Sequence, residues 1–338
     1  MESPTLADWV GDVESFSSHQ WQHKPAVFTP ETLASPFDLD ELDAAFDSGL
    51  LRTPYLEMVR SNKVTVPTEA YTTSRVVNGA THHGFADRAK VVGLLRAGAT
   101  LLLRHVDQWH RPTADLVARL SGELDRRVEA FFFVTPADGQ GLAIHRNDAD
   151  VFALQVAGRK TWYVHGAPTT ADWSLGELPD DEDSPQLLRG VPKPGNVLYI
   201  PRGFAHRAVG EAGLSAHPSL TIRDICLRDL TAALRQCLTE DLDIPARPLG
   251  EAAITDACAT LLSHARAKLD TIAPHDLRHS ARAAQTQTRQ PGGEAPPPET
   301  FTATARNWSS DTPGAKRTGL ASVVRAWHRL RGTRRGTA

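Results

Sequence analysis

Residues 135–166 read TPADGQGLAIHRNDADVFALQVAGRKTWYVHG, and this stretch decides the fold class of the 338-residue chain. A glycine-rich turn delivers His145 at the start of two predicted strands, over residues 151–156 and 161–164. Downstream, residues 195–209 read GNVLYIPRGFAHRAV and place His206 after another strand and a tight turn. The two segments therefore predict that histidines from well-separated strands end a short distance apart in one β-structure.

Further strands extend the same β-rich region in both directions. Short apolar runs at residues 100–103, 128–134 and 197–200 are separated by Gly, Pro and Asp segments. Several short strands with turn signals between them are typical of a barrel or jelly roll, so we predict a mainly β core. The chain before about residue 125 otherwise indicates helices and loops, whereas residues 224–272 show helical periodicity that predicts a helical appendage.

These changes in the residue pattern predict that the chain has three parts. Residues 1–223 form a β domain with an N-terminal lead-in, and residues 224–274 form a helical region that is a candidate for dimerisation. Residues 275–338 form a low-complexity linker, with the run PGGEAPPPET, and a basic C-terminal helix. That helix has no acidic residue among its arginines and lysines. We interpret it as a solvated tail, with docking to nucleic acid or to an acidic partner as the alternative.

The overall composition is that of an ordinary soluble globular protein. Hydrophobic residues make up 41% of the chain and the formal net charge is -3, so no global charge bias indicates nucleic acid. Apolar runs of about 18 residues, which membrane helices need, are missing. The three cysteines, Cys226, Cys237 and Cys258, lack CxxC spacing and predict neither a disulfide framework nor a zinc site. We expect a cytoplasmic protein that is neither secreted nor membrane-inserted.

His145 and His206 are candidate metal ligands. Two histidines from separated strands of a barrel can converge inside its mouth, which is how a site with two histidines and one carboxylate holds a single iron ion. Such a site leaves coordination positions open for oxygen and a bidentate 2-oxo acid. The chain has 14 histidines, and most histidines in proteins are not ligands. These two are distinguished by the segments around them.

Those segments resemble the JmjC-type cupins, and within them the ribosomal-oxygenase-like 2-oxoglutarate-dependent protein hydroxylases. The resemblance spans roughly residues 9–225 and includes a lead-in, FSSHQWQHKPAVF, at residues 16–28. The first block of matching residues comprises Thr135, Pro136, His145, Asp150, Val151, Phe152, Gln155, Gly158, Arg159, Lys160 and Trp162. The second block comprises Gly195, Leu198, Tyr199, Pro201, Arg202, Gly203 and His206.

The resemblance implies a double-stranded β-helix of the cupin or jelly-roll type that binds iron(II) and 2-oxoglutarate. It implies that His145 and His206 bind the metal, and that Lys160 pairs with the distal carboxylate of 2-oxoglutarate. Ser215 matches a serine that can hydrogen-bond this co-substrate, on a strand that also carries His217. No catalytic residue beyond the metal site is implied. The expected reaction converts 2-oxoglutarate to succinate and hydroxylates a polypeptide, either a ribosomal protein or a ribosomally made peptide precursor.

Two positions depart from the family pattern. Asn147 stands where the carboxylate ligand is expected, and Phe133 stands where a tyrosine is expected. An amide oxygen can bind a metal but carries no charge, while the adjacent Asp148 reaches the site only if a bulge turns it inward. Three hypotheses remain: a hydroxylase with an unusual ligand set, a non-catalytic cupin-type binding module, and an oxidative halogenase. Halogenation needs an open coordination position for chloride, and Asn is too large a residue to leave one.

Overall fold

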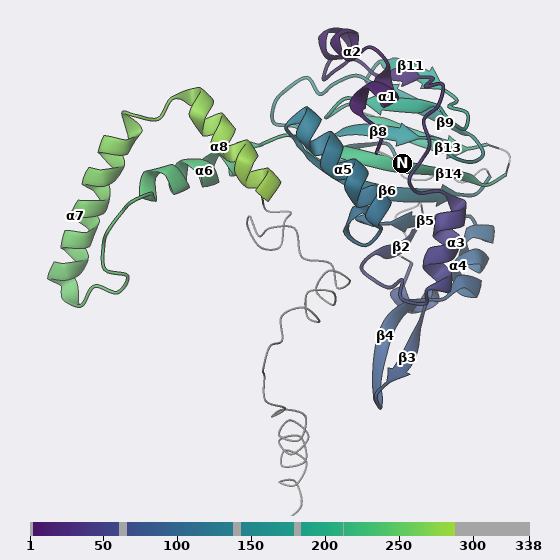
Figure 1. Cartoon of the computed structure of the whole chain (residues 1–338), viewed down its shortest axis with the longest axis horizontal. Coiled ribbons are helices and arrows are strands. Elements are labelled where there is room, and N and C mark those ends of the chain that lie inside the picture. Colours follow the sequence, from purple (N-terminus) through teal and green to yellow (C-terminus); the bar gives the residue numbers. More distant parts are fainter. Residues whose placement is uncertain (1–2, 61–65, 138–142, 179–183, 212, 288–338) are drawn as a thin grey trace, which may run out of the picture. The chain divides into compact units, whose positions relative to one another are not determined.

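The computed structural model describes residues 3–60, 66–137, 143–178, 184–211 and 213–287 (Figure 1). The helices are α1 (Leu6–Val10), α2 (Val13–His19), α3 (Leu39–Asp47), α4 (Arg88–Arg96), α5 (Arg111–Leu124), α6 (Leu227–Thr239), α7 (Gly250–Leu269) and α8 (Pro274–Gln287). The strands before the glycine-rich turn are β1 (Ala26–Phe28), β2 (Leu56–Val59), β3 (Thr72–Val77), β4 (Ala80–Ala86), β5 (Thr100–Leu103) and β6 (Arg127–Thr135). Those after it are β7 (His145–Arg146), β8 (Asp150–Leu154), β9 (Lys160–His165), β10 (Gly176–Glu177), β11 (Gln186–Gly190), β12 (Val197–Ile200), β13 (His206–Gly210) and β14 (Ser215–Arg223).

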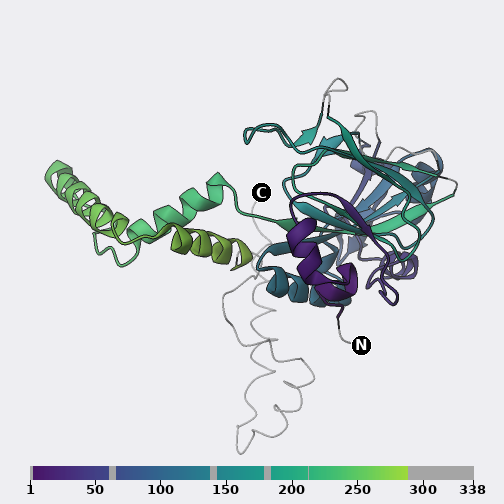
Figure 2. The same ribbon diagram turned by 90° about the horizontal axis from the view of Figure 1, so that it is seen from above.

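Two antiparallel sheets form the body of the protein, in agreement with the predicted mainly β core. The larger sheet has seven strands in the order β1-β12-β8-β14-β6-β5-β2, and the smaller has five in the order β10-β7-β13-β9-β11. Figure 2 shows these strands curving round a shared interior. The strands predicted at residues 100–103 and 197–200 coincide with β5 and β12.

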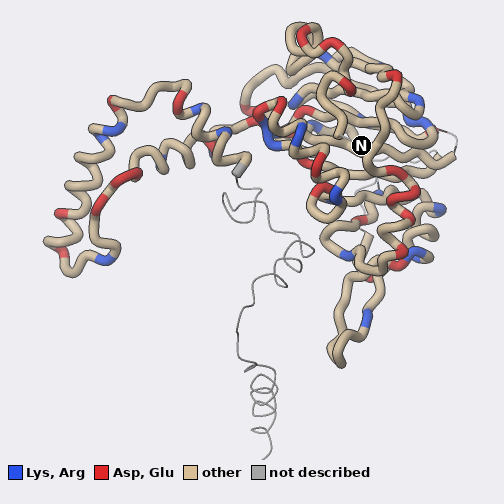
Figure 3. Tube along the Cα trace, in the orientation of Figure 1, with Lys and Arg blue, Asp and Glu red and all other residues tan. Residues whose placement is uncertain are grey.

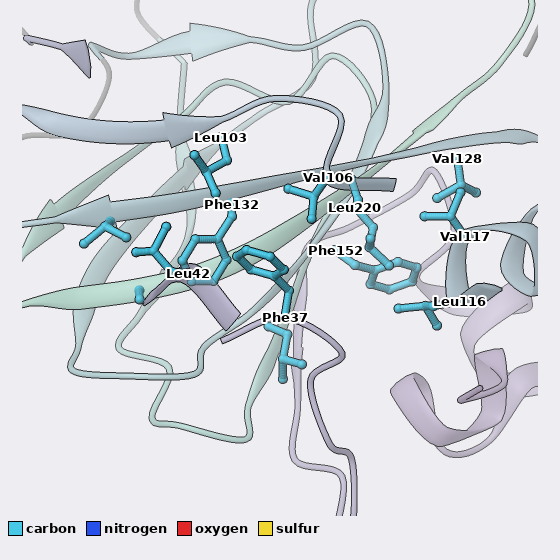
Figure 4. Close-up of a cluster of buried hydrophobic side chains, with 14 of the residues drawn as sticks. Phe37, Leu42, Leu103, Val106, Leu116, Val117, Val128, Phe132, Phe152 and Leu220 are labelled. Atoms are coloured by element: carbon cyan, nitrogen blue, oxygen red, sulfur yellow. The ribbon is translucent and has the colours of Figure 1, made fainter. Parts of the chain in front are cut away.

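The larger sheet is buried on both faces because its side chains alternate between two clusters. In β8, Phe152 joins the main core while Val151 points to the smaller sheet, where it packs with Trp162. The main core also takes side chains from α1, α2 and α5, which cover the outer face. Phe37, in the loop before α3, belongs to the same core (Figure 4) and meets Phe132 edge to face, with ring centroids 4.9 Å apart. The helices thus leave the inner face free to form a site.

The N-terminal region contains more β-structure than the sequence indicated. Besides β5, it contributes β1 and β2 to the larger sheet, and β3 and β4 form a separate hairpin that projects from the body (Figure 1). The turn of this hairpin is Asn78-Gly79, and both residues have positive φ, 51° and 78°. This is the pattern of a two-residue hairpin turn. Its strands were missed because their side chains are mostly exposed and show no apolar run.

The C-terminal helices correct one predicted boundary. The linker was predicted to begin at residue 275, but Pro274–Gln287 is helix α8. Its sequence, PHDLRHSARAAQTQ, is rich in helix-forming residues and buries Ala281, whereas the Pro- and Gly-rich run begins only at residue 291. The rest of that linker and the predicted basic helix lie outside the described residues. Among the helices that are described, none has the length and apolar character needed to cross a membrane.

Candidate functional site

A pocket of about 280 Å³ lies between the inner faces of the two sheets. The smaller sheet contributes His145, Lys160, Trp162, His206 and Ala208 to its wall. The larger sheet contributes Phe131, Phe133, Thr135, Val151, His217, Ser219, Thr221 and Arg223. Four of the five predicted site residues, His145, Asn147, Lys160 and His206, therefore meet in this pocket.

The two predicted metal-binding histidines are brought together by strand pairing. His145 on β7 is the direct register partner of His206 on β13, and their ring centroids are 4.3 Å apart. The Nδ1 atom of His145 lies 2.8 Å from the carbonyl oxygen of Ala143, and that of His206 lies 3.0 Å from the carbonyl oxygen of Phe204. A carbonyl can only accept, so each Nδ1 carries the proton. Each Nε2 is left with a lone pair, as a metal ligand requires.

Burial keeps both histidines neutral. Desolvation lowers the pKa of His145, and desolvation together with the neighbouring His145 lowers the pKa of His206 to about 3. Neutral imidazoles are the form that binds metal, so these histidines are ready to bind at physiological pH without releasing a proton.

The side chains of Asn147 and Asp148 point to different partners. The Asn147 amide lies beside the metal-facing edge of His206, with Nδ2 3.4 Å from Nε2. The Asp148 carboxylate accepts a 2.6 Å hydrogen bond from Nε of Arg202, and the two side chains form an ion pair. At the bend that follows β7, Asn147 thus lies beside the histidines and Asp148 pairs with Arg202, although both residues line the pocket. Within the described chain, no group of three His, Cys, Asp or Glu residues is arranged to hold a metal.

Lys160 is a buried cation without an anion. Its side chain is wholly buried, and its ammonium nitrogen lies 3.2 Å from Nδ1 of His217. Among the described residues, no carboxylate pairs with it. Desolvation lowers the pKa of Lys160 to about 7, and desolvation and Lys160 together hold the pKa of His217 well below its usual value. An ammonium group placed at a pocket wall in this way calls for an anionic ligand.

Ser215, the fifth predicted site residue, lies opposite Thr135 of the pocket wall, and its contact with the co-substrate stays a prediction. Ser215 is completely buried, does not line the pocket, and accepts a 2.8 Å hydrogen bond from Nε2 of Gln155. Packing in the same region also explains why position 158 of the motif is a glycine. Gly158 has φ +60°, and a Cβ there would lie 2.0 Å from the carbonyl oxygen of Leu214. The start of β14 therefore packs against the turn before β9.

Sequence reasoning missed three pocket residues on β14, namely Ser219, Thr221 and Arg223. They occupy every second position after His217 and so share its face of the strand. The two-residue period of a strand could therefore have predicted them. His217 itself stacks on Phe133, with ring centroids 5.1 Å apart and planes 6° from parallel. Phe133 therefore supplies an aromatic face for the histidine that contacts Lys160.

Comparison with known proteins gives a consistent result. Residues 105–230 match a family model described as a JmjC domain. Ribosomal oxygenase 1 of Bos taurus is 29% identical over 188 residues, which are 53% of this chain and 28% of that protein. A bifunctional lysine-specific demethylase and histidyl-hydroxylase, NO66 of Drosophila persimilis, is 41% identical over 86 residues, 25% of this chain and 12% of that protein. The chain thus spans well under half the length of these relatives.

Solved structures share the cupin-type fold. The ribosomal oxygenase YcfD of Escherichia coli is 19% identical, with a TM-score of 0.53 over 92% of this chain and 80% of that one. A second structure of YcfD, in complex with cobalt and 2-oxoglutarate, has a TM-score of 0.53 over 86% of this chain and 75% of the other.

Proposed function

We propose that this chain, which carries a JmjC domain homologous to those of ribosomal oxygenases, is an iron(II)- and 2-oxoglutarate-dependent oxygenase that hydroxylates a polypeptide. One observation carries the proposal. Two neutral histidines with unprotonated Nε2 atoms share a pocket with a buried lysine that has no carboxylate partner among the described residues. The first group fits a metal and the second fits the distal carboxylate of a 2-oxo acid.

We also infer a double-stranded β-helix and a helical appendage. From β6 onward the chain passes repeatedly between the two sheets: β6, β8, β12 and β14 belong to the larger sheet, and β7, β9 and β13 to the smaller. Crossing back and forth in this order would wind the core as the sequence resemblance implies. Helix α6 contacts both α7 and α8, and the three helices would form the appendage.

Each residue of the site would have a distinct task. His145 and His206 would bind the metal, with the amide oxygen of Asn147 as the third donor after the amide turns round. Lys160 would hold the distal carboxylate, and Nδ1 of His217 would accept a hydrogen bond from the Lys160 ammonium group and orient it. When bound, iron(II) and 2-oxoglutarate supply oxidative decarboxylation to succinate, coupled to insertion of one oxygen atom into a C–H bond. Trp162 and Phe133 would keep water from this chemistry.

The direct test is anaerobic titration of the purified protein with iron(II) and 2-oxoglutarate. We expect a visible charge-transfer band, because a 2-oxo acid must chelate the metal through its keto and carboxylate oxygens to give one. The protein with 2-oxoglutarate alone, and with succinate in its place, serves as control. A protein that binds iron(II) and 2-oxoglutarate separately without forming the band would contradict the proposal.

A non-catalytic binding module is the second candidate. It is favoured by the amide of Asn147 in place of a carboxylate, and by the engagement of the nearest carboxylate, Asp148, with Arg202. A neutral third donor leaves the site more positive and holds iron(II) less tightly. The two candidates differ in turnover, since only the oxygenase would consume 2-oxoglutarate.

Substitution of Asn147 and Asp148 separates two arrangements of the third ligand. We expect Asn147→Asp to tighten iron(II) binding by about tenfold or more, because it adds a charged donor beside His206. Asp148→Ala should leave the metal affinity nearly unchanged, because this carboxylate contacts Arg202. The measurement is anaerobic iron(II) titration of both variants. Loss of iron from Asp148→Ala, with no gain in Asn147→Asp, would show that Asp148 turns inward. No effect in either variant would favour the binding module.

We also propose a homodimer formed through α7. This helix buries none of its side chains and exposes Ile254, Leu261, Leu262 and Leu269, which helical spacing places on one stripe. A second copy of the chain would cover this stripe. Light scattering after size-exclusion chromatography should therefore give the mass of a dimer, and Leu262→Glu should shift it to the monomer. Ala259→Glu, on the same helix but outside the stripe, is the matched control. Equal masses for the two variants would refute this interface.

Two proposals rest on the sequence alone. A cytoplasmic location is proposed from the spacing of the cysteines. A ribosomal protein or a ribosomally made peptide precursor is proposed as the substrate by analogy with the relatives.

A further inference from the structure

A wider groove of about 460 Å³ adjoins the pocket that contains His145 and His206, here called the inner pocket. Four residues, Arg104, Phe131, Asp148 and Arg223, line both spaces, so the groove opens directly onto the inner pocket. The remaining lining comprises His105, Arg127, Glu129, Asp224, Cys226, Arg228, Asp229 and Gln285. A chain lying in the groove could reach the site past Phe131.

The groove wall carries four arginines and four carboxylates, and positive charge is in excess around one of these carboxylates, Glu129. Glu129 is almost wholly buried and is shared by two arginines: Arg127 Nη2 is 2.6 Å from one of its carboxylate oxygens and Arg223 Nε is 2.7 Å from the other. Burial by itself would raise the pKa of Glu129, but hydrogen bonding from Arg223 and the charges of both arginines lower it. Glu129 is therefore ionised, and its single charge leaves one guanidinium charge uncompensated.

The other carboxylates of the groove are also engaged. Asp148 pairs with Arg202, and Asp224 is shared by Arg126 and Arg282, at 3.2 and 3.4 Å. Asp229 accepts a 2.9 Å hydrogen bond from the backbone nitrogen of Cys226. Elsewhere on the described chain, basic and acidic segments are interspersed (Figure 3). The uncompensated positive charge of the groove thus lies beside Glu129, at Arg127 and Arg223.

Two polar atoms of the walls have no partner. Nε of Arg127, on the groove, and the hydroxyl oxygen of Thr221, in the inner pocket, are buried and make no hydrogen bond within the described part of the protein. Both groups can donate a hydrogen bond. Buried donors are normally satisfied, so they indicate a ligand that supplies acceptors.

We propose that the groove binds an acidic segment of the polypeptide substrate, with one Asp or Glu carboxylate at Arg127 and Arg223 and a neighbouring uncharged side chain in the inner pocket. This inference rests on the proposed function. The inner pocket is mostly apolar, and its single described carboxylate, Asp148, is already paired with Arg202. An arginine or lysine entering it would find no counter-charge, whereas an uncharged side chain would bury apolar surface.

Arginine substitutions that preserve the buried ion pair provide the test. Arg127→Gln and Arg223→Gln each leave Glu129 with one arginine, so each removes the excess charge without stranding a carboxylate. Glu129→Gln does the opposite and frees both arginines. Arg111→Gln is the matched control for net charge, because Arg111 is exposed on α5 and pairs with Asp115 away from the groove.

Fluorescence anisotropy on the full-length, metal-free protein would measure binding of a short labelled peptide rich in glutamate. Two matched peptides carry glutamine or lysine in place of every glutamate. We expect the glutamate peptide to bind at least about fivefold more tightly than the glutamine peptide, with the difference shrinking at high salt. Arg127→Gln and Arg223→Gln should each weaken it by about fivefold, Glu129→Gln should strengthen it, and Arg111→Gln should have no effect.

Three results would overturn the inference. They are equal binding of the glutamate and glutamine peptides, tighter binding of the lysine peptide, and stronger competition by a single-stranded RNA of the same charge, which would make the groove a nucleic-acid site. These results are independent of the proposed function, because the peptide assay needs no metal. A charge-transfer band without selective peptide binding would retain the oxygenase and reject the acidic substrate. Peptide binding without the band would instead identify a binding module with the same groove.

Discussion

Replacing His206 with alanine is expected to lower the affinity for iron(II) by at least about a hundredfold. Even the loss of a residue that only hydrogen-bonds to a metal ligand lowers metal affinity by about ten- to a hundredfold. His206 presents an Nε2 lone pair to the pocket beside His145, and the one carboxylate of the described pocket lining, Asp148, is engaged by Arg202. His145→Ala should give the same result. The two remaining donors would be one imidazole and one neutral amide, which hold iron(II) poorly.

Anaerobic iron(II) titration, followed by metal analysis after gel filtration, would measure the loss. His165→Ala is the matched control: this histidine also donates through Nδ1 to a backbone carbonyl, that of Ser184, but does not line the pocket. Thermal unfolding of the metal-free proteins would separate loss of the ligand from loss of the fold. Full metal occupancy in His206→Ala would exclude it as a ligand.

Replacing Lys160 with methionine is expected to weaken 2-oxoglutarate binding by about 1.5–3 kcal/mol, the range for a hydrogen bond to a charged group. Methionine keeps most of the length and apolar character of the side chain and removes the charge. The free energy of unfolding of the metal-free protein should rise rather than fall, because a buried ammonium without a described carboxylate partner is itself costly. Isothermal titration and thermal unfolding would measure the two effects.

The pH dependence gives an independent check on Lys160. Its native pKa is lowered to about 7, below the ordinary lysine value of about 10.4 that applies in the unfolded chain. Between these values the unfolded state binds more protons, so the stability of the metal-free protein should increase as the pH rises through this window. Lys160→Met should lack this increase. Affinity for 2-oxoglutarate should fall over the same window, because the co-substrate needs the charged lysine. Unchanged affinity in the variant would place Lys160 outside the co-substrate site.

The sequence predicted those parts of the fold in which the side-chain pattern matches burial. The strand at residues 100–103 is buried on both faces and reads as an apolar run, and it was found at its full length. The hairpin of β3 and β4 is exposed along most of its length, so its strands carry no such run. The predicted start of the linker at residue 275 was wrong because α8 is stabilised by helix propensity and a small contact surface rather than by large apolar residues.

The candidate site could be predicted where a motif fixes both a residue and its direction. His145, Lys160 and His206 lie in such motifs, and the structure brings them to one pocket. The match to a JmjC domain and to ribosomal oxygenases confirms the recognised family. Ser215 pairs with the pocket residue Thr135 but does not itself line the pocket, so its contact with the co-substrate stays a prediction. The pairing of Asp148 with Arg202 similarly joins segments 54 residues apart.

The shortness of β7 has a thermodynamic consequence. This strand consists of His145 and Arg146 alone, and only one register pair, that of the two histidines, joins it to β13. A metal bound across that pair would act as a crosslink between the strands, so ion binding and local opening of β7 would be linked equilibria. Adding iron(II) should therefore slow amide hydrogen exchange at β7 and its neighbours more than in the core of the larger sheet, where protection already reports global unfolding.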